Sequence, residues 1–137
     1  KASVGVLGFL GVAVVLISLL SANLAYRGEY QIGGVDLAQV AQGRDNVLTA
    51  LRGIRGTSAA FGAAYGILLL SIVFGPYRRG ERWAWWALCA AFVALAALVA
   101  IRVPLTGERL GVGAALTHAG VGIFGLLLDV GRLRSNA

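Results

Sequence analysis

The chain has 137 residues, of which 58% are hydrophobic and only 13% are charged, and it carries a net charge of +6. This composition excludes an ordinary soluble domain, in which about a quarter of the residues are charged. Its basic residues all lie outside the long apolar runs, so we expect the positive charge to meet anionic lipid headgroups rather than nucleic acid. The longest polar segment, residues 27–55, is too short for a core of its own, and we therefore expect one membrane domain over residues 1–137.

The residues that carry most catalytic chemistry are scarce. Cys89 and His118 are the only cysteine and the only histidine of the chain, which excludes an intrachain disulfide, a CxxC redox pair and the usual His- and Cys-rich metal clusters. The serines lack the second histidine or suitably placed acid that a catalytic triad needs. We therefore predict that the protein is not an enzyme.

Four long runs of the sequence contain no charged residue, and they hold 25, 22, 19 and 19 residues. A helix rises about 1.5 Å per residue and the bilayer hydrocarbon is about 30 Å thick, so each run is long enough to span a membrane. We predict an all-α fold, a bundle of four transmembrane helices. The expected spans cover approximately residues 2–23, 57–76, 83–102 and 110–130.

The first run is longer than the apolar part of a signal peptide, so we interpret it as a retained helix. In the interfacial loop of residues 27–55, apolar residues recur at spacings of three, four and seven, which predicts two short amphipathic helices on the membrane surface. Asp36 and Asp45 are the expected N-caps, and Gly43 interrupts the pattern between them. The alternative is an ordinary ordered loop that covers the end of the bundle.

Glycine, proline and tryptophan mark the expected ends of the second and third spans. We expect Gly75-Pro76 to end the second span, because proline lacks the backbone donor. The short turn of residues 77–82 then makes the second and third helices antiparallel neighbours. The third helix opens with three tryptophans, which are typical anchors at the membrane interface, and Pro104 is expected to close it. These tryptophans are Trp83, Trp85 and Trp86.

The arginines that border the spans indicate an orientation. The basic residues divide equally between the two sides, but three of those on the side of the termini lie within one short turn. Because arginines concentrate in short cytoplasmic loops, this cluster indicates that the side with both termini faces the cytoplasm. The richness in Arg, Ala and Gly is typical of a GC-rich bacterial genome, so we expect a bacterial inner-membrane protein with both termini in the cytoplasm.

His118 is the sharpest candidate for a binding residue, because it lies near the middle of the fourth expected span. Gly111, Ala114, Gly122 and Gly125 stand at −7, −4, +4 and +7 from it, so small residues flank it along one face. The spacing from Ala114 to His118 looks like that of membrane helices that bind chlorophyll or haem, where a small residue makes room for the ring and the imidazole binds the metal. The alternative is ordinary helix packing, which also uses small residues and interhelical hydrogen bonds.

A second candidate site consists of arginines. Arg52 and Arg55 enter the second span on one face, and Arg102 leaves the third span on the same expected side. Together they could bind a lipid phosphate or another acidic ligand, and plain interfacial anchoring is the alternative. The first three spans hold no charged residue of the kind that ion-coupled transporters place in the bilayer. We expect Asp129, at the end of the fourth span, to pair with Arg132.

A further indication comes from the order of motifs after residue 45. Asn46-x-Leu48-x-x-x-Arg52 leads into a Gly-rich helix, an Arg-rich turn, an Ala/Leu helix that ends in Ile101-Arg102, and a final apolar helix. In this order the chain resembles small bacterial four-helix integral membrane proteins classed only as a domain of unknown function. The resemblance covers about two thirds of the chain. It implies the four-helix fold and no particular activity.

The spans carry faces of small residues, end in aromatic and arginine anchors, and contain almost no reactive side chains. This combination favours a protein that acts by packing against other proteins. We expect an accessory or structural subunit of a larger membrane complex, of respiratory or photosynthetic type. Two alternatives stay open: a tetrapyrrole-binding subunit that holds chlorophyll or haem through His118, and a small carrier of lipids or solutes. The expected partners are membrane lipids and other membrane-protein subunits.

Overall fold

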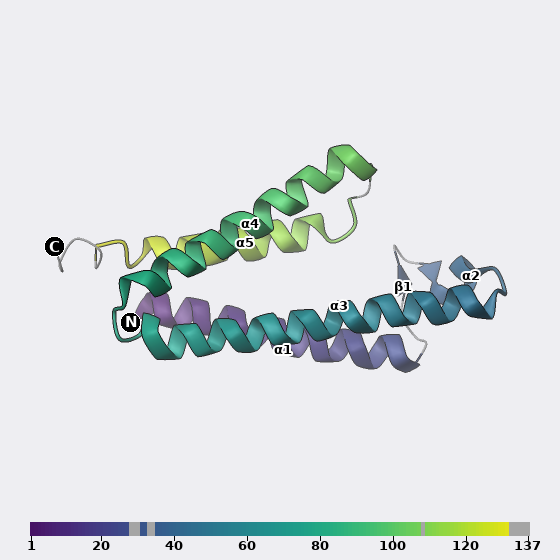
Figure 1. Ribbon diagram of the computed structural model, residues 1–137, viewed down its shortest axis with the longest axis horizontal. Coiled ribbons are helices and arrows are strands. Elements are labelled where there is room, and N and C mark those ends of the chain that lie inside the picture. Colours follow the sequence, from purple (N-terminus) through teal and green to yellow (C-terminus); the bar gives the residue numbers. More distant parts are fainter. Residues whose placement is uncertain (28–30, 33–34, 108, 132–137) are drawn as a thin grey trace. The chain divides into compact units, whose positions relative to one another are not determined.

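The computed structural model describes residues 1–27, 31–32, 35–107 and 109–131. These residues are almost entirely helical, which confirms the predicted all-α class. In chain order the elements are α1 (Ala2–Arg27), β1 (Gln31–Ile32), β2 (Val35–Asp36), α2 (Leu37–Ala41), α3 (Asp45–Ile72), the π-helical turn η1 (Val73–Tyr77), α4 (Arg82–Thr106) and α5 (Val112–Leu127) (Figure 1).

Three helical segments are long and apolar enough to cross a membrane, and they fall on the first three charge-free runs. They are α1 with 26 residues, α3 together with η1 with 33 residues, and α4 with 25 residues. The fourth apolar helix, α5, has 16 residues and extends less far than the expected span of residues 110–130. At its N-terminal end the cause is Gly111, whose φ of +74° is a left-handed conformation that does not continue a helix. At the other end, residues 128–130 form turns.

The second amphipathic helix expected in the loop is not a separate element, and that part of the prediction is wrong. α2 ends at Ala41 and is followed by left-handed Gln42 and Gly43, as the interruption at Gly43 indicated. The next helix begins at Asp45 and continues without a break to Ile72. No proline lies within it, and its mid-helix glycines each cost only about 1 kcal/mol relative to alanine, too little to break the helix.

The structure has a helix distortion at Gly75-Pro76, where the sequence indicated the end of a helix. The regular part of α3 ends at Ile72, and Gly75-Pro76 lies in η1. Within this turn Gly75 leaves helical geometry, with φ of −92° and ψ of −109°. The chain therefore changes direction at these residues before α4 begins.

Pro104 does not close the third span, contrary to the prediction, because α4 continues through it to Thr106. The carbonyl groups around the proline stay hydrogen-bonded: Thr106 Oγ1 donates to the carbonyl of Arg102 at 2.8 Å, and the N–H of Gly107 donates to the carbonyl of Val103 at 2.9 Å. Pro104 removes only the bond that its own N–H would donate to the carbonyl of Ala100, and these bonds hold the turn that follows it. The helix ends instead at Gly107, whose φ is +71°.

The chain forms two compact units, and the first comprises residues 1–11 and 68–137. In its described part α4 and α5 lie side by side (Figure 1), with the fully buried ring of Phe92 in the contact. The indole Nε1 of Trp85 on α4 donates to the carbonyl of Leu126 at 3.1 Å. The first residues of α1 belong to the same unit, where the hydroxyls of Ser3 and Tyr77 share a buried hydrogen bond.

The second unit comprises residues 12–67 and therefore holds the rest of α1, the short β1–β2 pair, α2 and most of α3. Here α1 and α3 approach closely at glycines of α3: the Ser18 hydroxyl lies over Gly62, and the ring of Tyr26 lies over Gly56. Glycine permits such close contact between membrane helices. The strands β1 and β2 are antiparallel, and Leu37 of α2 is fully buried.

Candidate functional site

His118 lies in the contact between α4 and α5, within the first unit. Its side chain is half-buried, and its imidazole is tilted against the ring of Phe92, with ring centroids 5.8 Å apart and an angle of 56° between the ring planes. Phe92 is fully buried, and Ala119, next to His118, is 2% exposed. The histidine is thus part of the packed surface between two apolar helices.

The small residues expected around His118 divide into two groups. Gly122 and Gly125 are buried against neighbours: a Cβ on Gly122 would overlap the Phe92 ring, and one on Gly125 would lie 3.1 Å from Leu7 Cδ2. Gly111 is the left-handed N-cap of α5, and a Cβ there would meet nothing within 4 Å; Ala114 is exposed. The structure therefore places a phenyl ring over Gly122, where the tetrapyrrole hypothesis needs room, and leaves the surface around Gly111 and Ala114 open.

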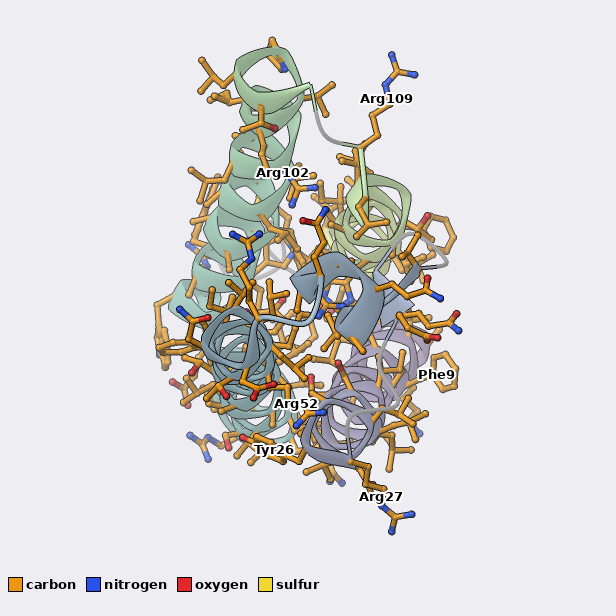
Figure 2. The ribbon with its side chains drawn as sticks, turned by 90° about the vertical axis from the view of Figure 1, so that its right-hand side faces the viewer. Phe9, Tyr26, Arg27, Arg52, Arg102 and Arg109 are labelled. Atoms are coloured by element: carbon orange, nitrogen blue, oxygen red, sulfur yellow. The ribbon has the colours of Figure 1, made fainter. Side chains whose placement is uncertain are left out.

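The three arginines of the second candidate site fall in different units. Arg102 belongs to the first unit, and its Nη2 donates to the carbonyl of Leu110, so it closes the connection between α4 and α5. Arg52 and Arg55 both lie on α3 in the second unit, half-buried. Within the described part of the chain, Nε of Arg52 is buried and has no hydrogen-bond acceptor. In Figure 2, Arg27 and Arg109 extend away from the ribbon, as surface anchors do.

A groove that the sequence analysis missed lies in the second unit, along α3 and the end of α1. It has a volume of about 400 Å³ and is lined by Tyr26, Gly56, Thr57, Ala60, Phe61 and Ala64. A Cβ on Gly56 would lie 2.6 Å from the hydroxyl oxygen and from Cε1 of Tyr26, so the tyrosine ring forms a wall of the groove beside Gly56. The sequence pattern that could have indicated this groove is Gly56-x-x-x-Ala60-x-x-x-Ala64, which places small residues on one face of a helix. Arg52 precedes this pattern by the same spacing of four residues.

The tryptophans expected as anchors do not share one role. Trp83 and Trp86 are 56% and 62% exposed, which suits an interfacial position, whereas Trp85 turns inward to Leu126. Glu81, just before α4, accepts a hydrogen bond from Trp83 Nε1 at 2.6 Å and one from Arg79 Nε at 2.8 Å. These bonds, that of Trp83 first, lower the pKa of the Glu81 carboxyl below its ordinary value.

The remaining expectations concern ionisable clusters and the C-terminal pair. Among the residues that the structure describes, no group of three or more His, Cys, Asp or Glu is placed to hold a metal ion. Arg132, the expected partner of Asp129, and Arg134 lie outside the described residues.

The comparisons with known proteins add no family. No protein-family model matches the chain, and no curated protein and no solved structure matches it.

Proposed function

We propose that the chain is a non-enzymatic integral membrane protein, a bundle of four transmembrane helices that serves as an accessory subunit of a larger membrane complex. The observation that carries this proposal is how little of its apolar surface is covered. In the most apolar stretches of α1, α3 and α4, only 33%, 22% and 11% of the residues are buried. In water each exposed Å² of apolar surface costs about 25 cal/mol, whereas lipid removes that cost.

The outer face of α4 is the surface that best suits a protein partner. It is the least covered of the three long helices, and exposed residues recur along it at spacings of three and four. These residues are Ala90, Ala94, Ala97 and Ile101. Alanines on one face let a second membrane helix approach closely, which gives van der Waals contact where no hydrophobic effect operates. We call this surface the alanine face.

The contacts between the helices also support a structural role rather than a catalytic one. Gly8 lies against Phe74, Gly62 against Ser18 and Gly122 against Phe92, so close helix contacts occur in both units. The arginines and tryptophans at the helix ends support a position in the inner membrane, and the charge density of residues 78–82 supports cytoplasmic termini. A reporter fused to the C-terminus tests this orientation.

Co-purification from native membranes in a mild detergent tests the accessory role. We expect the wild-type chain to bring a membrane-protein partner in fixed stoichiometry, and Ala94→Phe, which places a bulky ring on the alanine face, to lose it. Ala60→Phe is the matched control, because Ala60 is also exposed and apolar but lies on α3 in the groove. A wild-type chain that purifies alone, or equal partner retention by both variants, would contradict the proposal.

A further inference from the structure

The groove of the second unit has a charged end. Its lining follows one face of α3 from Gly56 to Ala64, which corresponds to about 12 Å along the helix axis. Arg52 lies four residues before Gly56 and therefore on the same face, one turn beyond the groove. The apolar groove therefore begins about one helical turn from the position of Arg52.

The depth of these residues in a membrane follows from the charge-free runs. Residues 56–77 contain no charge; their regular helix, up to Ile72, extends about 25 Å and continues into η1, which is close to the hydrocarbon thickness of about 30 Å. Arg52 and Arg55 stand just before this run, and Arg27 stands just after that of α1. Because Tyr26 packs on Gly56, the charged ends of both runs lie at one level within this unit. The guanidinium of Arg52 is therefore at the depth of lipid phosphates, and the groove is at the depth of the first half of the acyl chains.

The surroundings of Arg52 favour an anion. Its Nε is buried without an acceptor among the described residues, and a buried donor in that condition is costly. The acidic residue nearest to it along α3 is Asp45, seven positions away. A guanidinium binds phosphate through its outer nitrogens with charge-assisted, often bidentate hydrogen bonds, so a phosphate group complements the charge at this end of the groove.

We propose that this groove binds one anionic phospholipid, with its phosphate on Arg52 and one acyl chain along Gly56, Ala60 and Ala64. The side chains of Tyr26 and Phe61, 67% and 73% exposed, give the groove aromatic walls. A projecting Phe61 suits a narrow acyl chain better than a second helix, which packs on a flat surface of small residues. The site requires that α1 and α3 span a membrane, but it does not depend on the chain being an accessory subunit.

Native mass spectrometry of the full chain, purified in a non-ionic detergent and titrated with phosphatidylglycerol, tests the site. We expect one lipid bound per chain, and an affinity about tenfold lower for Arg52→Gln, because a charge-assisted hydrogen bond is lost. Ala60→Phe fills the groove and should weaken binding by at least about tenfold, since contact with several methylene groups is lost. Ala64→Phe repeats the test at a second position, and circular dichroism identifies any variant that does not fold.

The matched controls are Arg27→Gln, which removes an equal charge from a side chain that extends away from the helices (Figure 2), and Ala94→Phe, which adds an equal ring outside the groove. Both should retain the wild-type affinity within about twofold, because an isolated surface charge contributes little. Equal binding of zwitterionic phosphatidylcholine, competition by inorganic phosphate that removes the lipid completely, or equal losses in Arg27→Gln and Arg52→Gln would overturn the proposal. Because Ala60→Phe and Ala94→Phe have opposite expected effects on lipid and partner, failure of the lipid site is distinguishable from failure of the accessory role.

Discussion

Replacement of Gly122 by alanine is a direct test of the contact between α4 and α5. A methyl group there would overlap the ring of Phe92, and that ring is fully buried, so it cannot swing outward to make room. Overpacking of this kind costs about 1–3 kcal/mol. We expect Gly122→Ala to lower the free energy of unfolding by that amount, despite the higher helix propensity of alanine.

Reversible unfolding in mixed micelles, followed by circular dichroism, measures this change. Gly120→Ala is the matched control, because it lies on the same helix and its added Cβ would meet nothing within 4 Å. It should be neutral or stabilising by up to about 1 kcal/mol. In the double variant Gly122→Ala/Phe92→Leu, the smaller side chain should recover part of the loss, which gives a coupling free energy between the two positions. Equal stabilities of Gly120→Ala and Gly122→Ala would refute the described contact.

Three other predictions use the same protein and simple spectroscopy. Gly8→Ala should cost less than about 1 kcal/mol in the same assay, because the ring it meets, Phe74 at 2.9 Å, is 53% exposed and can move; a larger loss would show that the ring is held in place. The lowered pKa of Glu81 means that its stabilising contribution is present above the unfolded-state pKa and is lost as the pH falls through the lower folded-state pKa. Trp83 fluorescence, measured with Trp85 and Trp86 replaced by phenylalanine, should therefore change in acid, and Glu81→Gln should abolish that change. If the tetrapyrrole hypothesis for His118 is correct, the chain purified from native membranes has a visible absorption band that His118→Ala removes; a band that survives the substitution would contradict it.

The long helices were predictable from the sequence because charge in a bilayer is expensive, so charge-free length by itself marks a candidate span. Their ends were less predictable, because they depend on local hydrogen bonds that compete with the usual breakers. Pro104 is the example: the sequence marks it as a helix end, but the bonds from Thr106 to Arg102 and from Gly107 to Val103 form after it, and α4 continues to Thr106. A helix start at Asp45 was expected, but its continuation into the second span was missed, because an amphipathic pattern and an apolar pattern lie on one unbroken helix.

The candidate sites were predictable only in part. Residues that share a face of one helix follow from their spacing, whereas contacts between residues of two different helices do not. The stripe of small residues around His118 can be read from spacing, but its neighbour Phe92 comes from another helix, and spacing does not say which faces meet. Likewise, the three arginines appear equivalent in the sequence. The structure gives Arg102 a carbonyl partner in its own connection. It places Arg52 one helical turn before a groove that includes Tyr26, a residue of α1 that is 26 positions earlier in the chain.

The shortness of α5 has a consequence for the membrane around it. In the proposed four-span arrangement, its 16 residues would extend about 24 Å and leave a hydrophobic mismatch of about 6 Å against about 30 Å of hydrocarbon. Lipids beside a short helix thin locally, at a fraction of a kcal/mol per Å, and long flanking side chains such as that of Arg109 reach back to the headgroups. That arrangement would favour the protein in thinner bilayers, so the acyl-chain length of the host membrane would affect both its location and its stability.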